Sequence, residues 1–485
     1  MAGQPVTMHQ PWQLRIPAAM AAELEAHLFP GDADEHGAVL VASMVTTPRG
    51  VRLLGRHLGL ACDGVDYVAG NRGYRMLTPR FVQDQILKCA SSGLVYLAVH
   101  CHKGSDTVAF SATDLASHER GYPALLDIAD GPPVGALVFA GNAVAGDIWR
   151  RNGSRVALED AVVAGLPLKI LRAAPPPRPR DDPTFDRQSR LFGDRGQAVL
   201  ASQKVGVVGA GGAGSLLVEY LARLGVGHLV VIDPDRIERS NHPRVVGSRR
   251  RDSMHLLTAA SRPRAVRALG HHLATRKVMV ARRVALGANP DIAFDGISAD
   301  VTDPAVARML IDCDYLFLAA DSMRARLVFN ALVHQYVIPG VEVGAKIQLG
   351  RDGSAVDVFS VVRPVLPGFG CLWCNGLIDP ARLQEESTSG AQLGRQRYVD
   401  DAEVHAPSVI TLNAVAAAHA ANEYMLSVTG MLPLSYQPCW QRFHATTQRS
   451  IDRAITEIPR RDAACTECST SGRLGAGNAR RLPTH

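Results

Sequence analysis

A glycine-rich turn between an apolar strand and an apolar helix constrains the fold of this chain most. Residues 204–208 (KVGVV) predict a buried strand, and residues 212–224 predict a helix. The turn has the G-x-G-x-x-G spacing at Gly209, Gly211 and Gly214, and Gly212 is a fourth glycine at one of the variable positions. Because glycines let a backbone approach a phosphate and a helix N-terminus presents amide donors to it, the turn predicts a nucleotide site.

Strands and helices continue to alternate for about 150 residues. Apolar strands are predicted at HLVVID (228–233), DYLFLAAD (314–321) and VIPGVEVG (337–344), with helical segments between them. This order predicts an α/β fold with a Rossmann-like, doubly wound and mostly parallel sheet. Asp233 ends the second strand, where it could bind ribose hydroxyls, and an NAD-dependent oxidoreductase would share this feature.

The residues after Asp233 separate an adenylyltransferase from an oxidoreductase. The segment from Asp233 to Arg244 (DPDRIERSNHPR) closely resembles the D-x-D…S-N-x-x-R element of the ThiF/MoeB/HesA family, the ubiquitin-activating-type adenylyltransferases. The resemblance extends over most of residues 184–470. Its further elements are the opening FDRQ…LFG at residues 185–193, Lys277, Asp321 at a strand end and Asn413 in a late helix.

This resemblance implies ATP-dependent adenylation of a carboxylate, in which fixed cations and Mg²⁺ surround the phosphates. It implies that Asp233 binds ribose, that Asn241 helps to orient the phosphates and that Asp321 carries Mg²⁺. It also implies that Arg244 and Lys277 supply positive charge.

Two further expectations come from the same resemblance. Arg187 would reach the triphosphate across a homodimer interface. Because the segment after Arg244 is longer than is usual in the family, Arg276 is an alternative to Lys277. Relatives that form a thioester or relay sulfur usually carry a crossover cysteine, and residues 375–438 contain none. We therefore expect direct transfer of the acyl-adenylate, with Cys439 as a structural thiol rather than a nucleophile.

Two C-x-x-C pairs predict a structural metal site. Cys371 and Cys374 form one pair, and Cys465 and Cys468 form the other. Each two-residue gap lets both thiolates bind one tetrahedral ion, and four sulfurs close the coordination sphere, so we expect structural Zn²⁺. The pairs also resemble the ThiF-type pattern. A redox C-x-x-C is the competing interpretation.

A proline-rich segment predicts the boundary between two domains. Residues 173–183 (AAPPPRPRDDP) contain five prolines, which favour an extended spacer. We predict a smaller α/β domain over residues 1–172, the adenylyltransferase domain over 184–470 and a loose tail over 471–485.

The first domain carries a candidate catalytic metal site. His100 and His102 end an apolar strand and, two residues apart, face the same side of it. Ser111 and Asp114 follow, and Glu35 precedes the apolar strand GAVLVASMV. The order E…H-x-H…S-x-x-D resembles the JAB/JAMM (MPN) metalloprotease family over roughly residues 12–150.

The second resemblance implies an isopeptidase. Zn²⁺ would be bound by His100, His102 and Asp114, with Glu35 as the general base and Ser111 as the oxyanion stabiliser.

Three alternatives stay open for the first domain. Ser111 and Asp114 could form a helix capping box, with the histidines as ordinary polar residues at a strand end. Asp106 could replace Asp114 as a ligand. A degenerate domain could recognise a protein partner without catalysis.

Together the two resemblances imply that the chain activates a small ubiquitin-like or sulfur-carrier protein. Ubiquitin-like conjugation in bacteria predicts a conjugating enzyme as a further partner and a processing role for the isopeptidase. Activation of a sulfur carrier for thiamin, molybdopterin or cysteine synthesis predicts a sulfurtransferase instead. A catalytically decayed scaffold is the alternative from another class.

Charge and hydropathy limit the classes of partner that the chain could bind and the place in the cell where we expect it. The net charge of +6 is too small to indicate nucleic acid. Residues 244–283 contain eleven Lys and Arg against Asp252 alone, which predicts a solvated face or a surface for polyphosphate or an acidic protein. No stretch reaches the roughly 18 apolar residues of a membrane span, and the first residues lack a signal-peptide layout, so we expect a cytoplasmic protein.

Overall fold

The chain divides into two compact units. The structure is a computed structural model that describes residues 10–69, 75–177, 182–349, 355–387, 407–445 and 454–484. The first unit contains the residues up to Pro177 together with His334–Val337 and Cys468–Arg480, and the second contains the remainder. The units separate in sequence within the segment 173–183, of which residues 178–181 lie outside the described part. Residues 1–9, where we noted no signal-peptide layout, lie outside it too.

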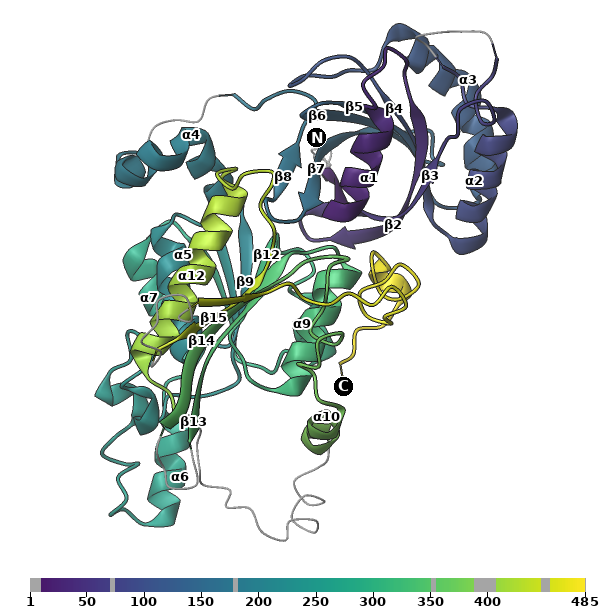
Figure 1. Ribbon diagram of the computed structural model, residues 1–485. Coiled ribbons are helices and arrows are strands. Elements are labelled where there is room, and N and C mark those ends of the chain that lie inside the picture. The colour runs from purple at the N-terminus through teal and green to yellow at the C-terminus, as the bar shows by residue number, and fades with distance from the viewer. Residues whose placement is uncertain are drawn as a thin grey trace, which may run out of the picture. The chain divides into compact units, whose positions relative to one another are not determined.

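The first unit is an eight-stranded mixed sheet with helices packed on both faces (Figure 1). Its strands are β1 (Trp12–Pro17), β2 (Gly37–Thr47), β3 (Gly50–Leu60), β4 (Val95–Cys101), β5 (Val134–Ala140), β6 (Ala143–Trp149), β7 (Arg155–Ala164) and β8 (Lys169–Leu171). Its helices are α1 (Ala18–Leu28), α2 (Pro79–Ser92) and α3 (Ala112–Ala129) within the described residues. The strand order is β1-β3-β2-β4-β5-β6-β7-β8, and β1 pairs in parallel with both β3 and β7, which closes the sheet on itself.

Alternating side chains of the strands build the two larger hydrophobic clusters of the first unit. On β2, Leu40 packs in a cluster with Leu24 of α1, whereas the next residue, Val41, packs with Phe81 of α2 and Tyr122 of α3. Successive residues of a strand point to opposite faces, so one strand supplies both clusters. The sheet therefore holds α3 against the face opposite α1.

Residues 471–480 are packed, so the prediction of a loose tail is wrong for them. Leu474 and Ala476 are buried, and the carbonyl oxygen of Gly475 accepts a 2.6 Å hydrogen bond from Ser43 Oγ of β2. Gly475 and Gly477 have a local role in this segment, because they adopt positive φ angles of 64° and 52°. The segment belongs to the first unit.

The second unit is also built on an eight-stranded sheet. Its strands are β9 (Lys204–Val208), β10 (His228–Ile232), β11 (Ala293–Ile297), β12 (Tyr315–Leu318), β13 (Gly340–Leu349), β14 (Ala355–Val365), β15 (Trp440–His444) and β16 (Ala454–Glu457). Its described helices are α4 (Asp186–Ser202), α5 (Gly212–Arg223), α6 (Arg264–Leu273), α7 (Lys277–Ala288), α8 (Pro304–Arg308), α9 (Met323–Gln335), α10 (Pro380–Ser387) and α12 (Ile410–Val428).

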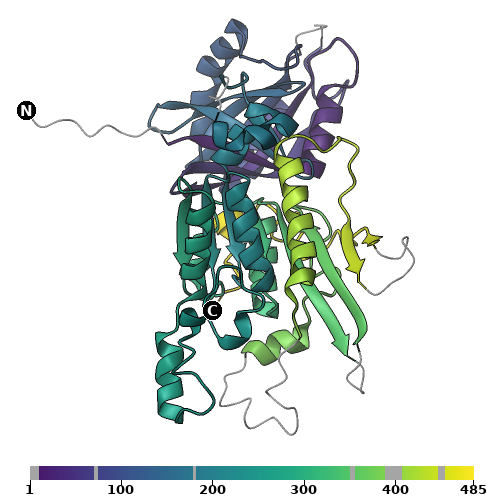
Figure 2. The ribbon, with the colours of Figure 1, turned by 90° about the vertical axis from the view of Figure 1, so that its left-hand side faces the viewer.

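The strand order β11-β10-β9-β12-β13 is parallel throughout, which confirms the predicted Rossmann-like α/β fold of this unit. The sheet continues with β14, β15 and β16, which are antiparallel and were not predicted. α12 packs beside α5 and against β13 and β14 (Figure 2). From β9 the chain adds β10 and β11 on one side, and it then returns to add β12 and β13 on the other side. The position between β9 and β12 is therefore the switch point of the sheet. Doubly wound sheets bind ligands at this point, at the carboxyl ends of the strands.

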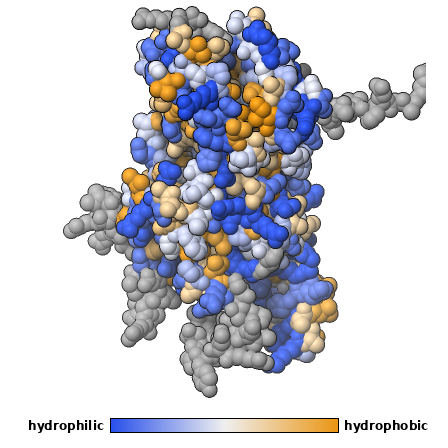
Figure 3. Space-filling view, turned by 90° about the vertical axis from the view of Figure 1, so that its right-hand side faces the viewer, coloured by the Kyte–Doolittle hydropathy of each residue, from blue (hydrophilic) through white to orange (hydrophobic). Residues whose placement is uncertain are grey.

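Hydrophilic side chains cover much of the face drawn in Figure 3, with smaller hydrophobic groups between them. Among the described helices, none combines the length and the apolar content that crossing a membrane needs. In the basic segment 244–283, Asp252 pairs with Arg283 at 2.7 Å, and most of the other arginines are exposed. Both interpretations of that segment stay open.

Candidate functional sites

The glycine turn lies between β9 and α5, at the switch point of the second unit. Gly209 has a φ of +94°, and a Cβ at Gly214 would overlap the carbonyl oxygen of Gly209. A Cβ at Gly212 would overlap the side-chain amide of Asn413 from α12. In contrast, nothing lies within 4 Å of the Cβ position of Gly211. The turn is therefore closely packed on its inner side and open at Gly211, as a phosphate-binding turn requires.

Asp233 follows β10 and holds this turn. Its Oδ2 accepts a 2.7 Å hydrogen bond from the backbone N–H of Ala210, and its Oδ1 accepts a 2.8 Å bond from the N–H of Asp235. The residue is 4% exposed, and burial raises the pKa of its carboxyl although the Lys277 ammonium acts in the opposite direction. Ribose binding stays a prediction for Asp233, and the structure adds a role in fixing the turn.

The choice between Lys277 and Arg276 follows from their contacts. Lys277 begins α7, and its Nζ lies 2.7 Å from Asp235 Oδ2 and 3.7 Å from Asp233 Oδ1. Arg276 turns instead to Ser298, whose carbonyl oxygen and hydroxyl accept hydrogen bonds from its guanidinium. Lys277 is therefore the candidate cation beside Asp233. Sequence reasoning missed Asp235, although it is the second carboxylate of the D-x-D element.

Arg244 and Asn241 lie in the loop after β10. Arg244 is half-buried, and its Cδ lies 3.7 Å from the Cβ position of Gly212, so its stem contacts the start of α5. Its guanidinium has no hydrogen bond or ion pair with the described residues. Asn241 is buried, and its Oδ1 accepts a 3.0 Å hydrogen bond from the N–H of Glu238. Arg244 is thus free to meet an anion near the turn, whereas Asn241 holds the loop.

Asp321 and Arg187 are both exposed. Asp321 lies between β12 and α9 at the carboxyl edge of the sheet, and Arg187 lies in the first turn of α4. Glu386 of α10, which sequence reasoning missed, accepts hydrogen bonds from the N–H groups of Met323 and Arg324 at 2.9 and 3.0 Å. Glu386 therefore caps α9, which begins at Met323, two residues after Asp321. The roles assigned to Asp321 and Arg187 stay predictions.

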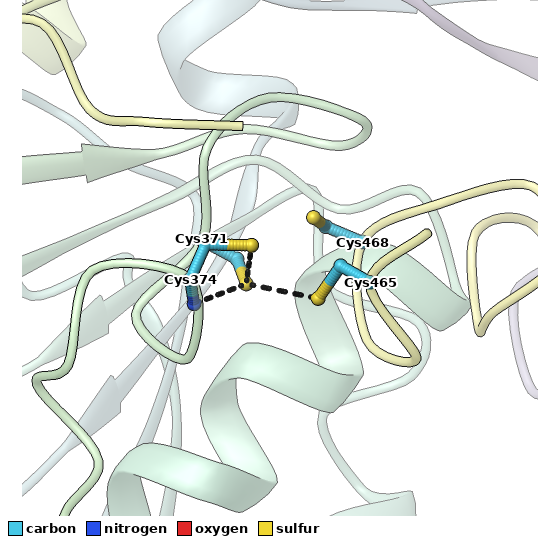
Figure 4. A group of neighbouring side chains, drawn as sticks. All are labelled: Cys371, Cys374, Cys465 and Cys468. Atoms are coloured by element: carbon cyan, nitrogen blue, oxygen red, sulfur yellow. Dashed lines mark hydrogen bonds between the residues drawn. The ribbon is translucent and has the colours of Figure 1, made fainter. Parts of the chain in front are cut away.

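The four predicted zinc ligands lie together (Figure 4). Cys371 Sγ is 3.5 Å from Cys374 Sγ and 3.8 Å from Cys465 Sγ, and all four sulfurs, including that of Cys468, lie within 4.8 Å of one another. Zn–S bonds of ~2.3 Å at tetrahedral angles separate sulfurs by about 3.8 Å. Burial raises the pKa of the Cys374 thiol to about 11, so a bound cation would be needed to favour the thiolate of this residue. The cluster fits structural zinc.

Asn375 ties the two cysteine turns together. Its Nδ2 donates to the carbonyl oxygens of Cys371 at 2.9 Å and Arg460 at 3.0 Å, and its Oδ1 accepts from the N–H of Arg460 at 2.9 Å. Sequence reasoning missed it, because its partner is 85 residues away. Cys439 lies outside the cluster and is half-buried, and burial raises the pKa of its thiol, which disfavours a nucleophile.

The histidines and Asp114 of the first unit meet at the end of β4. His100 Nε2 is 3.2 Å from His102 Nε2, and Asp114 Oδ2 is 3.6 Å from the first and 3.3 Å from the second. Zinc bonds of ~2.0–2.1 Å at tetrahedral angles separate the ligand atoms by about 3.3 Å. The three side chains fit one metal ion.

The hydrogen bonds around these ligands orient them. His102 Nδ1 lies 3.1 Å from the carbonyl oxygen of Ala109; because that oxygen only accepts, Nδ1 carries the proton and Nε2 offers its lone pair. Asp114 Oδ2 accepts hydrogen bonds from both N–H and Oγ of Ser111 at 2.7 Å. Burial opposes ionisation of Asp114, but the nearby His100 ring and the hydrogen bonds from Ser111 hold the pKa of this carboxyl well below the usual range.

The capping-box interpretation of Ser111 and Asp114 is confirmed, because each side chain accepts from the backbone of the other at the start of α3. It does not exclude the metal site, since the same carboxylate faces the histidines. Glu35 Oε1 lies 4.0 Å from His102 Nε2, at the edge of the site. Asp106 bonds instead to Ser105 and Asn142, and it is absent from the ligand group found in the described residues.

Several proteins of known function are similar in sequence to part of this chain. The SAMP-activating enzyme E1 of Haloferax volcanii is 32% identical over 215 residues, which cover 43% of this chain and 69% of that protein. The molybdopterin-synthase adenylyltransferase of Escherichia coli is 29% identical over 167 residues, covering 34% and 59%. The sulfur carrier protein ThiS adenylyltransferase of Bacillus subtilis is 28% identical over 204 residues, covering 40% and 54%.

Among solved structures, the microcin C7 biosynthetic enzyme MccB with N-formylated MccA aligns at 15% identity with a TM-score of 0.44, over 89% of this chain and 100% of that chain. The ThiF family matches residues 185–467, which begin after the main segment of the first unit. The likeness of the first unit to the JAB/JAMM family therefore stays a prediction. Since the match covers more than half of the sequence, including the glycine turn and Asp233, the chain belongs to the ThiF family.

Proposed function

We propose that the second unit is an ATP-dependent adenylyltransferase that acts on the C-terminal carboxylate of a small ubiquitin-like or sulfur-carrier protein. The observation that carries the proposal lies at the switch point of the sheet, where Asp233 accepts a hydrogen bond from the glycine turn and lies beside the ammonium of Lys277. The names of the relatives, an activating enzyme and two adenylyltransferases, support this reaction class.

In the proposed reaction, a carboxylate oxygen forms a bond to the α-phosphorus of ATP, and the bond from that phosphorus to the bridging oxygen breaks. Pyrophosphate leaves with the electron pair. Arg244, which has no protein partner among the described residues, would receive the phosphates together with the amides around Gly211. Lys277 would balance charge beside the nucleotide. Mg²⁺, for which Asp321 is the candidate ligand, would offset the charge of the leaving pyrophosphate.

Two pathways fit this chemistry. Ubiquitin-like conjugation would transfer the acyl group to a conjugating enzyme or an acceptor, and sulfur-carrier activation would pass it to a sulfurtransferase. The absence of a cysteine from residues 375–438 favours direct transfer in either pathway. Covalent protein adducts would indicate conjugation, whereas a thiocarboxylate on the partner's C-terminus would indicate sulfur transfer, and mass spectrometry distinguishes the two.

The experiment that tests adenylation is ATP–pyrophosphate exchange by the full chain. The probe is a small protein ending in Gly-Gly encoded beside this one, and a copy without its last two residues is the substrate control. We expect exchange to require the intact terminus and to be lost in Asp321→Ala. Asp291→Ala should retain exchange, because Asp291 is exposed and precedes β11, at the end of the strand opposite to the carboxyl edge. Unchanged exchange in Asp321→Ala would remove that residue from the site. Dinucleotide binding without exchange would support the oxidoreductase instead.

For the first unit, we propose a zinc-dependent isopeptidase that processes or removes the same partner. The spacing of His100, His102 and Asp114 is the observation that supports it. Zn²⁺ would supply an acidified water when bound. Glu35 would accept the proton of that water. The Ser111 hydroxyl, which donates to Asp114 in this structure, would turn to donate to the developing oxyanion.

The isopeptidase is tested with the partner extended at its Gly-Gly terminus by a reporter peptide. Wild-type chain should release the reporter, and Glu35→Gln should lose the activity while keeping its zinc. Release by a His100→Ala/His102→Ala variant at the wild-type rate would contradict the proposal.

A further inference from the structure

A buried pair behind the first-unit metal site is not explained by the roles proposed above. His118 of α3 and Asp147 of β6 are both more than nine-tenths buried, and His118 Nδ1 lies 3.2 Å from Asp147 Oδ2. Because a carboxylate accepts, the histidine Nδ1–H donates this bond. Burying a histidine and a carboxylate costs free energy, which their mutual hydrogen bond offsets only in part. We therefore expect the pair to have a specific role.

The pair connects the helix that supplies one ligand to the sheet that supplies the others. Asp114, His118 and Tyr122 follow one another at intervals of four residues and form the buried stripe of α3. On the other side, β6 pairs with β5, and β5 pairs with β4, which ends next to His102. The hydrogen bond therefore fixes α3 against the strands, one helical turn from Asp114.

Three further hydrogen bonds hold the carboxylate of Asp147 in place. Its Oδ2 also accepts from Trp149 Nε1 at 2.9 Å and from Arg155 Nη2 at 2.7 Å, while its Oδ1 accepts from Arg155 Nε at 3.1 Å. Burial works against ionisation of Asp147, but the bonds from His118, Arg155 and Trp149 lower the pKa to about 2. The carboxylate is therefore an ionised acceptor with a fixed orientation.

The ring of His118 makes a second connection to the site. It stacks on Tyr122 with centroids 4.6 Å apart, and it meets the ring of Phe110 edge-on at 5.0 Å. Phe110 in turn lies 6.1 Å from the ring of the ligand His100. One side chain thus supports both the helix that carries Asp114 and the aromatic ring behind His100.

We propose that His118 and Asp147 are a positioning pair, which keeps Asp114 and His100 at distances where both bind the same Zn²⁺. The proposal rests on the proposed metal site. Residues that orient metal ligands from behind typically change metal affinity by about 10- to 100-fold when they are removed. A pair that only stabilised the fold would leave the zinc affinity of the folded protein unchanged.

The test measures zinc on the full-length chain by elemental mass spectrometry and by competition with a chromophoric chelator. The His100→Ala/His102→Ala variant provides the baseline of the four-cysteine cluster. His118→Phe keeps the ring stacking without the hydrogen bond, and Asp147→Asn keeps the volume without the charge. Asp160→Asn is the matched control, because Asp160 is a buried carboxylate of β7 that accepts from Gln13 and Arg172.

We expect His118→Phe and Asp147→Asn to lower the zinc affinity of the first-unit site about 10- to 100-fold, with Asp160→Asn at the wild-type value. His118→Asn, whose Nδ2 can donate to Asp147, should recover part of the loss. Wild-type affinity in a folded His118→Phe or Asp147→Asn variant would overturn the positioning role. If wild type holds no more zinc than the His100→Ala/His102→Ala baseline, the metal site itself fails, and this outcome is distinct. Thermal melts of each variant establish that the protein compared is folded.

Discussion

Asp233→Asn tests how the nucleotide turn is held. The carboxylate of Asp233 accepts from two backbone donors, the N–H groups of Ala210 and Asp235, with one oxygen each. An asparagine of nearly the same size offers one accepting oxygen, so either the buried N–H of Ala210 or the partly buried N–H of Asp235 loses its partner. An unpaired buried donor costs about 1–3 kcal/mol. Since each ~1.4 kcal/mol is a factor of ten, local opening at that donor should become about 5- to 150-fold more frequent.

Hydrogen–deuterium exchange of the full chain measures this opening directly. Peptides that cover Ala210 or Asp235 should exchange faster in Asp233→Asn, while peptides from the first unit stay unchanged. Asp235→Asn is the control, because the Asp235 side chain is 62% exposed and its pair with Lys277 is worth roughly 0–1 kcal/mol. Wild-type exchange of both peptides in Asp233→Asn would refute the conclusion that this carboxylate fixes the turn.

Three further predictions concern charge, metal and pH. Lys277→Met should lower ATP–pyrophosphate exchange about 10²–10³-fold, whereas Lys204→Met, which breaks a 3.0 Å pair with Asp312 at the opposite end of β9, should retain exchange. Cys465→Ser should lose about one zinc ion per chain and lower the melting temperature, and Cys313→Ser, a buried thiol outside the cluster, should keep the metal. Burial raises the pKa of Glu423 from 4.5 to about 7, so the folded state holds a proton that the unfolded state has lost, and stability falls as pH rises from about 4.5 through about 7. Glu423→Gln should therefore flatten the fall in melting temperature between pH 5 and pH 8, and an unchanged pH profile would contradict that reasoning.

The nucleotide turn was predictable because its chemistry is local. Strand, glycines and helix follow one another within about 20 residues, and the spacing of Gly209 and Gly214 encodes the close approach that the structure contains. The two C-x-x-C pairs were predictable for a similar reason, since each pair carries its own geometry. The antiparallel strands β14 to β16 were not, because the alternation of strands and helices ends before them.

Residues whose roles depend on distant partners escaped prediction. His118 reads as an ordinary helix residue until Asp147, 29 positions later, is brought beside it through the pairing of β4, β5 and β6. The tail was misjudged in the same way. Only the contact of Gly475 with Ser43, 432 positions earlier, shows that this segment is packed.

The return of residues 468–480 to the first unit has a consequence for synthesis on the ribosome. The main segment of that unit is synthesised before the second unit, yet it lacks Leu474 and Ala476 of its core until the second unit has also been synthesised. At ~5–20 residues per second, the roughly 290 intervening residues take about 15–60 s to translate. The nascent first unit must remain incomplete for that interval, and a fragment cut at Pro177 would never complete it.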